Sequence, residues 1–246
     1  MQIRTLALAL ALPASTVLAQ PQVLMVVTNE ATMGQGGEAT GLWLEELAVP
    51  YAYLQQQGAK ITLASVAGGN APVDPRSLDT KQPKLLSFLK QHQQQLNHTA
   101  TISSLAGQAY DAVVLVGGHG TMWDFRQSDE LAALLSQQWQ QGASLAAVCH
   151  GVAGLLEVEV NGSKLVEGKR LTGFSNSEEA ILELTDVVPY ALETALVEAG
   201  ADYSQGANYT PYVVEDGRLI TGQNPMSSEA MAHLLWQQLD DDKRDH

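Results

Sequence analysis

The chain has one cysteine, Cys149, in the stretch SLAAVCHGVAG (144–154), where an apolar run meets a glycine-punctuated one. The thiolate of cysteine is a nucleophile, and the adjacent His150 could act as its base or as a positive neighbour. Gly151 leaves room for a sharp strand-to-helix turn that would point the cysteine into a crevice, and the helix N-terminus after that turn would lower the thiol pKa. The pattern predicts a catalytic cysteine, although a lone cysteine without such context is more often a small buried hydrophobic residue.

A second group of glycines, VGGHG (116–120), ends the preceding apolar run. The backbone N–H groups of Gly118 and His150 could form an oxyanion hole beside the sulfur, with a simple tight turn as the alternative. His119 falls near the same crevice by its position. The histidines are otherwise scattered without tight ligand spacing, so no metal site is predicted.

The elements that must position these residues alternate regularly along the chain. Four short apolar runs are typical of strands buried on both faces, and three stretches with helical spacing separate them. The runs are QVLMVVT, KITLASV, DAVVLVGG and SLAAVCH, and the helical stretches are 41–58, 79–96 and 128–142. This alternation predicts an α/β fold, a three-layer, flavodoxin-like, doubly wound and mostly parallel sheet, in one domain over 20–239. Ligands of such sheets bind at the carboxyl ends of the strands, where Cys149 lies.

The second half of the chain continues with helices and a hairpin. Residues 178–200 have helical spacing that is interrupted near Pro189. The stretch 212–222 predicts a hairpin that turns at 216–217, and 227–239 predicts a final helix. The glycine-rich stretch MGQGGEATG lacks the pattern of a P-loop or a dinucleotide fingerprint, so no cofactor is predicted.

The two ends of the chain differ from the domain in composition. Arg4, an apolar stretch and a small-residue cleavage pattern before Gln20 predict a signal peptide over 1–19. We therefore expect a periplasmic or secreted protein that has no membrane segment after cleavage. The acidic tail 240–246 is expected to fray.

The charge balance limits the classes of partner. The chain has 13 basic and 27 acidic residues, a net charge of −14, and no cluster of lysine or arginine. Nucleic acids and anionic membrane surfaces are therefore not expected as partners. A single cysteine also cannot form an internal disulfide, so an exported protein needs another reason to keep it.

Four blocks together resemble the ThiJ/PfpI superfamily, which has the class I glutamine amidotransferase-like fold. They are DAVVLVGGHGTMWDF, AAVCHGVAGLL, LTGFSNSEEAI and GRLITGQNP. A further block, TGLWLEELAVPY, is similar to the branch that contains stress-induced chaperones and glutathione-independent glyoxalase III enzymes. The resemblance covers nearly the whole chain after the predicted signal peptide.

The resemblance implies roles for four side chains. Cys149 matches the family nucleophile and His150 the histidine that follows it. Glu46 matches the carboxylate beside the sulfur, and Glu179 matches an acidic partner of the histidine. The adjacent Glu45 and Glu178 leave both glutamate assignments open by one position. A carboxylate and a thiolate repel each other, so one proton shared between Glu46 and the cysteine suits acid–base chemistry.

The resemblance implies a small aldehyde as substrate and a lyase reaction, methylglyoxal and water to lactate, without a cofactor. A holdase chaperone or an oxidative-stress sensor with the same reactive cysteine is the alternative. Protein deglycase and cysteine amidase or peptidase activities are further alternatives. Glutamine hydrolysis is disfavoured because the H-x-E pattern of family glutaminases does not occur. Family members commonly form dimers, which leaves a homodimer open.

Overall fold

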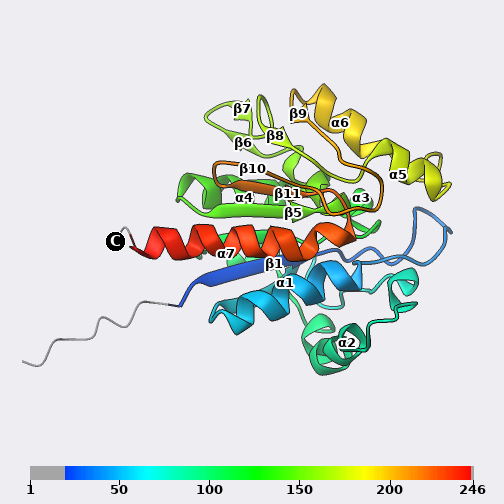
Figure 1. The fold of residues 1–246 in the computed structure, drawn as a ribbon, viewed down its shortest axis with the longest axis horizontal. Helices are drawn as coiled ribbons and strands as arrows, with labels where there is room; N and C mark the ends of the chain where they lie inside the picture. Colours follow the sequence, from blue (N-terminus) through cyan, green and yellow to red (C-terminus); the bar gives the residue numbers. More distant parts are fainter. Residues whose placement is uncertain (1–19, 245–246) are drawn as a thin grey trace, which may run out of the picture.

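The computed structural model describes residues 20–244, and a seven-stranded sheet lies at its centre (Figure 1). The strand order is β10-β11-β5-β4-β1-β2-β3. Neighbouring strands are parallel except for the β10–β11 hairpin. The order β2-β1-β4-β5-β11 is that of flavodoxin-like sheets, so the predicted doubly wound, mostly parallel sheet is confirmed.

The strands of this sheet are β1 (Gln22–Val27), β2 (Lys60–Ser65), β3 (Ala100–Thr101), β4 (Ala112–Leu115), β5 (Ser144–Val148), β10 (Val213–Asp216) and β11 (Leu219–Gly222). Two small sheets pair β6 (Glu159–Val160) with β7 (Ser163–Lys164), and β8 (Arg170–Leu171) with β9 (Asp202–Tyr203). The helices are α1 (Leu44–Gln56), α2 (Pro83–Leu96), α3 (Thr121–Asp124), α4 (Asp129–Gln140), α5 (Asn176–Ile181), α6 (Leu192–Glu198) and α7 (Ser228–Arg244). Four 3₁₀ helices complete the fold: η1 (Pro75–Leu78), η2 (Ile102–Leu105), η3 (Cys149–Leu155) and η4 (Pro225–Ser227).

The core follows from strands that are apolar on both faces. Every residue of β4, β5 and β11 is buried, as are all but the first of β1. Helices α1 and α7 pack against each other, and α7 also contacts β5 and β11. Helix α4 packs against β4, β5 and η3. This packing leaves the carboxyl ends of β1, β4 and β5 as the place where a crevice can form.

The predicted hairpin turn is confirmed, with Asp216 paired to Leu219 and Gly217 at a φ of 58°. Helix α7 continues into the predicted acidic tail as far as Arg244, beyond the predicted helix end at residue 239. Leu239 is buried at the end of the predicted helix, and a helix that is already formed extends at little cost. The predicted signal peptide over 1–19 lies outside the described residues. No helix among residues 20–244 is long and apolar enough to span a membrane.

Candidate active site

Cys149 lies at a sharp turn between β5 and η3, as the sequence predicts. Its φ is 57°, a left-handed conformation that non-glycine residues seldom adopt. Gly151 makes the turn possible, because a Cβ there would lie 2.6 Å from the Leu115 carbonyl oxygen in β4. Strain held in this way at one residue, on the order of 1–3 kcal/mol, is typical of functional turns.

The sulfur has a histidine on one side. Cys149 Sγ lies 3.3 Å from His150 Nδ1, and the whole cysteine is 4% exposed. Burial raises the pKa of the thiol well above its usual range, and the neighbouring Glu46 carboxyl raises it further. The expectation that a helix N-terminus lowers this pKa was therefore wrong. Desolvation and a like charge outweigh the single favourable contact from the His150 backbone N–H.

Glu46 also lies beside Cys149. The N–H of Trp43, just before α1, donates to the Gly117 carbonyl at 3.0 Å and so ties the start of α1 to the turn after β4. A Cβ added to Gly117 would lie 2.4 Å from Glu46 Oε2 and 3.0 Å from Cys149 Cβ, which places both groups against this glycine. Glu45 instead accepts a hydrogen bond from Gln82 in an exposed position. The structure thus brings Glu46, and not Glu45, to the cysteine.

The environment of Glu46 favours its protonated form. The residue is fully buried, and neither carboxyl oxygen has a hydrogen-bond partner that meets ordinary geometry among the described residues. Burial raises the pKa of Glu46 well above its usual range, and the nearby Cys149 thiol and Gly117 N–H offset this only in part. Two charges in one dry site are strongly disfavoured, so the Cys149–Glu46 pair carries at most one negative charge.

Glu179 bridges two histidines from the first turn of α5. Its Oε2 lies 2.7 Å from His150 Nε2, and its Oε1 lies 2.9 Å from His119 Nε2. Burial opposes its ionisation, but the two histidines hold the pKa of Glu179 well below its usual range. The bridge positions the His150 ring, which also packs on Phe174 with ring centroids 4.3 Å apart.

The adjacent Glu178 has a different role. It forms a capping box with Ser175 at the start of α5 and accepts hydrogen bonds from the Tyr209 N–H and the Asn224 amide, each at 2.8 Å. Successive side chains on a helix point about 100° apart, so fixing Glu178 in the cap turns Glu179 toward the histidines. The ambiguity between the two glutamates is resolved by this cap.

His119 and Arg76 were not assigned to the site from the sequence. Arg76 Nη2 lies 3.1 Å from His119 Nδ1 and 2.6 Å from Asp74 Oδ2. The position of His119 in VGGHG was a usable signal, whereas Arg76 lies in η1, 43 residues earlier, without a motif. Atoms of His119, His150 and Glu179 lie within 4.8 Å of one another, a spacing that could hold a metal ion. These atoms are already hydrogen-bonded to each other, and the prediction that no metal is needed stays a prediction.

The proposed oxyanion hole also stays a prediction. Gly118 has a φ of 112°, and a Cβ there would lie 2.3 Å from the Gly41 carbonyl oxygen and 2.5 Å from the Trp43 nitrogen. Only glycine fits this crossing of the turn after β4 with the start of α1. The His150 N–H lies against the sulfur, where it lowers the thiol pKa slightly.

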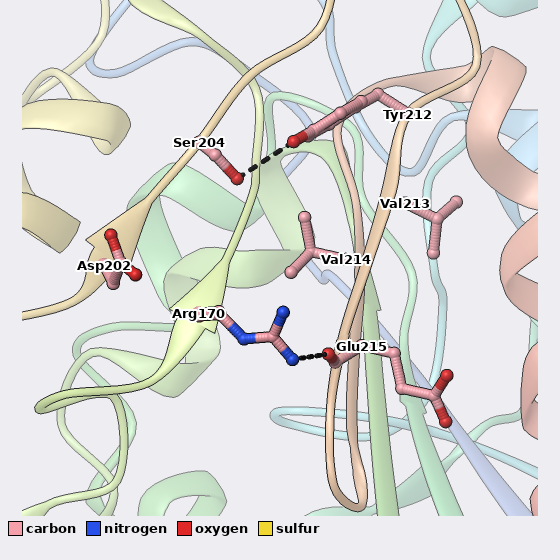
Figure 2. A pocket seen from close by; sticks show the side chains of 7 residues that line it. All are labelled: Arg170, Asp202, Ser204, Tyr212, Val213, Val214 and Glu215. Atoms are coloured by element: carbon pink, nitrogen blue, oxygen red, sulfur yellow. Dashed lines mark hydrogen bonds between the residues drawn. The ribbon is translucent and has the colours of Figure 1, made fainter.

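Two cavities help to locate the site. The groove in Figure 2, about 420 Å³, lies between the β8–β9 sheet and edge strand β10, and none of the predicted catalytic residues lines it. Its polar groups pair internally, since Tyr212 donates to Ser204 and Arg170 donates to the Glu215 carbonyl (Figure 2). A smaller cavity of about 150 Å³ lies beside α5 and is lined by Phe174 and Glu179. Of these two cavities, the one beside α5 is therefore the one that adjoins the candidate catalytic residues.

Comparison with known proteins gives consistent matches. The profile of the DJ-1/PfpI family matches residues 39–238. Glyoxalase 3 of Candida albicans is 28% identical over 84% of this chain and 93% of its own length. The glutathione-independent glyoxalase HSP31 of Saccharomyces cerevisiae is also 28% identical, over 87% of this chain and 96% of its own.

Solved structures agree with these matches. Rapid Encystment Protein 24 KDa of Francisella tularensis superposes with a TM-score of 0.86 at 38% identity and covers 89% of this chain and 99% of that one. Crystalline glyoxalase III from Candida albicans superposes with a TM-score of 0.80 at 26% identity, with coverage of 88% and 96%.

Proposed function

The chain belongs to the DJ-1/PfpI family, and from this premise we propose that it is a glutathione-independent glyoxalase. It converts methylglyoxal and water to lactate. The relatives named as glutathione-independent glyoxalases align over most of the chain, which favours this reaction over the amidase and deglycase alternatives. The observation that carries the proposal is the sulfur of Cys149, which lies 3.3 Å from His150 Nδ1 and beside the buried Glu46 carboxyl.

The first step is addition to the aldehyde. Cys149 Sγ forms a bond to the aldehyde carbon, and the π electrons of the C=O bond move to its oxygen. That oxygen takes the proton held by the Cys149–Glu46 pair and becomes the hydroxyl of a hemithioacetal. The backbone N–H groups of Gly118 and His150 stabilise the oxygen while it is charged. The sulfur is then neutral, so the remaining negative charge of the pair resides on Glu46.

The second step moves a hydrogen between carbons. The Glu46 carboxylate removes the proton from the sulfur-bearing carbon, and the electron pair forms the C=C bond of an enediolate while the ketone oxygen takes the proton of the neighbouring hemithioacetal hydroxyl. Glu46 then returns its proton to the carbon that was the ketone, and the oxygen left without a proton reforms a C=O bond at the sulfur-bearing carbon. The first carbon is oxidised and the second reduced by the same two electrons, which leaves a lactate thioester. Water activated by His150, which Glu179 orients, releases lactate and restores the thiol.

The direct test is turnover of methylglyoxal by the purified protein without glutathione. We expect lactate in stoichiometric yield, and we expect Cys149→Ala to fall by at least about 100-fold in kcat/KM because no other nucleophile replaces the sulfur. If the Cys149→Ala variant retained its activity, the mechanism would be contradicted. Thermal unfolding of the variant controls for misfolding.

A holdase role is the second candidate, and a specific surface favours it. Ile181, Leu182 and Val187, on and just after α5, are 58%, 40% and 44% exposed. Exposed apolar side chains grouped in this way suit binding of unfolded chains. Suppression of aggregation that is equal in the wild type and in Cys149→Ala, without lactate formation, would favour this role over the glyoxalase.

Two properties of the whole protein belong to the same proposal. We infer export to the periplasm or beyond, with cleavage before Gln20, from the composition of residues 1–19. N-terminal sequencing of the mature protein tests it, and a mature protein that begins at Met1 would contradict it. A homodimer is compatible with the family, and a measurement of the protein's mass in solution would establish whether it is a dimer.

A further inference from the structure

The site contains a relay of hydrogen bonds whose outer members, Asp74, Arg76 and His119, have no role in the reaction above. It runs from Asp74 through Arg76, His119 and Glu179 to His150. Each link is a contact between side chains, and four of the five members are buried, Arg76 being the partly exposed one. The members come from η1 and the residue before it, the turn after β4, η3 and α5. The relay therefore joins four segments of the chain into one polar network.

We propose that Arg76 and His119 are positioning residues, which fix through Glu179 the tautomer in which His150 presents an unprotonated Nδ1 to the sulfur of Cys149. The tautomer part of this inference stands on hydrogen-bond geometry alone. Its consequence for turnover rests on the proposed glyoxalase function.

The argument begins at Arg76, because a guanidinium group can only donate hydrogen bonds. Its Nη2 lies 3.1 Å from His119 Nδ1, so that nitrogen must accept. Asp74 holds the guanidinium in place with contacts of 3.0 Å to Nε and 2.6 Å to Nη2. Asp74 also accepts from Thr40 at 2.9 Å, and although burial opposes its ionisation, Arg76 holds the pKa of Asp74 below its usual value.

The next link is the contact of His119 with Glu179. A neutral imidazole that accepts at Nδ1 carries its proton at Nε2, and Nε2 lies 2.9 Å from Glu179 Oε1. His119 is 3% exposed, and burial lowers its pKa to about 4, which favours the neutral ring. His119 therefore donates to Glu179 and keeps that carboxylate as an acceptor.

The last link sets His150. An ionised carboxylate only accepts, so the second oxygen of Glu179, 2.7 Å from His150 Nε2, requires a proton on that nitrogen. In the neutral ring of His150 the lone pair then lies on Nδ1, which is 3.3 Å from Cys149 Sγ. This is the orientation in which His150 can take the thiol proton. The opposite tautomer would place a lone pair of His150 against the carboxylate.

The experiment that reports tautomers directly is a two-bond proton–nitrogen correlation spectrum of histidine-labelled protein at pH 7. His119→Asn and His150→Asn identify the two spin systems. In the wild type we expect His119 to be neutral with its proton on Nε2, and Nε2 of His150 to carry a proton as well. In Arg76→Met, we expect His119 no longer to occupy the Nε2-protonated tautomer alone, because its Nδ1 no longer faces a group that can only donate.

The kinetic readout distinguishes positioning from structural support. In Arg76→Met we expect kcat to fall by about tenfold or more with KM nearly unchanged, as for groups that orient a catalytic side chain through a hydrogen bond. Arg76→Gln keeps an N–H donor and should restore both the wild-type tautomer and part of kcat. Arg126→Met removes a distant arginine that pairs with Glu157, and it should change neither readout.

The outcomes separate the two proposals. A wild-type spectrum in which His119 carries its proton on Nδ1, or an Arg76→Met spectrum identical to the wild type, would overturn the relay whether or not the protein turns over methylglyoxal. The expected spectra in a protein without glyoxalase activity would keep the relay and reject the proposed reaction.

Discussion

Cys149 and Glu46 are 103 positions apart in the sequence, and they form a single ionising unit in the fold. Gly117 lies between them and has no side chain to separate the sulfur from the carboxyl. Burial raises the pKa of both groups, so each controls whether the other can ionise. An acid whose pKa is moved toward neutrality is the kind that carries protons efficiently between carbons.

The adjacent glutamates of α1 provide a matched pair of variants. We expect Glu46→Gln to lower kcat/KM for methylglyoxal by about 100-fold or more, since the amide cannot carry the proton. Glu45→Gln makes the same side-chain replacement one residue away and should stay within about twofold, because Glu45 accepts its hydrogen bond from Gln82 at an exposed position and carries no proton in the reaction. Initial rates of lactate formation measure both. Similar losses in the two variants would mean that helix α1, and not the carboxyl group, matters.

At the scale of elements, three turns determine the geometry of the site. The turn after β4 contains Gly117, the β5–η3 turn contains Cys149 in its left-handed conformation, and the cap of α5 contains Ser175 and Glu178. In the first turn, a Cβ at Gly117 would have no space. In the second, Cys149 has a positive φ that is unfavourable for a residue with a side chain. Each turn is stabilised by buried packing, so the site is as rigid as the core beneath it.

Replacing the glycine of the first turn tests this. Gly117→Ala would place a methyl group 2.4 Å from Glu46 Oε2 and from the Val148 carbonyl oxygen, and we expect a loss of about 2–3 kcal/mol in the free energy of unfolding. Activity should fall with it, because Glu46 must move. Gly58→Ala is the control: its φ of 99° is unfavourable for alanine, but no atom lies within 4 Å, so about 1 kcal/mol is lost and activity stays.

Urea unfolding measures both variants. Equal losses of stability in Gly117→Ala and Gly58→Ala would show that glycine is required at position 117 for its backbone conformation, and not because of the close contact with Glu46. Retained turnover in a folded Gly117→Ala protein would argue against the placement of Glu46 in the reaction.

At the scale of the whole molecule, Asp124 is an acid outside the relay with a buried carboxyl oxygen. Asp124, at the end of α3, accepts hydrogen bonds from Thr28 and from the Asn29 N–H, each at 2.8 Å, but its Oδ1 is buried without a partner among the described residues. Burial raises the pKa of Asp124 from 3.8 to about 7. The contact joins the carboxyl end of β1 to α3, so its protonation affects the stability of the fold around the crevice.

The sign of this effect follows from proton linkage. Between pH 4 and pH 7 the folded protein holds a proton on Asp124 that the unfolded chain has released, so Asp124 makes stability fall as pH rises through this window. Above the folded pKa the loss is complete, on the order of 2–4 kcal/mol. Asp124→Asn keeps the acceptor oxygen and removes the charge.

We therefore expect Asp124→Asn to be more stable than the wild type at pH 8 and to lose that advantage at pH 4. The difference between the two unfolding free energies, measured in urea at both pH values, isolates Asp124 from the other titrating groups. A constant difference across this range would show that Asp124 ionises normally in the folded protein.

Much of the fold could be predicted from the sequence because its determinants are local. The apolar runs at 22–28, 111–118 and 144–150 each form a strand of the buried sheet, and the cysteine lies at the end of one of them, where parallel sheets bind ligands. The 216–217 turn and the final helix followed from local patterns in the same way. These features depend on neighbours within a few residues, which the sequence displays directly.

Only the tertiary structure decided which side chains meet and how they ionise. It selected Glu46 over Glu45 by tying α1 to the turn after β4, and Glu179 over Glu178 by using the latter in the α5 cap. It also added a distant arginine to the relay and reversed the expected shift of the thiol pKa. Contacts between distant segments and the removal of water both arise from packing, and no short stretch of sequence contains that information.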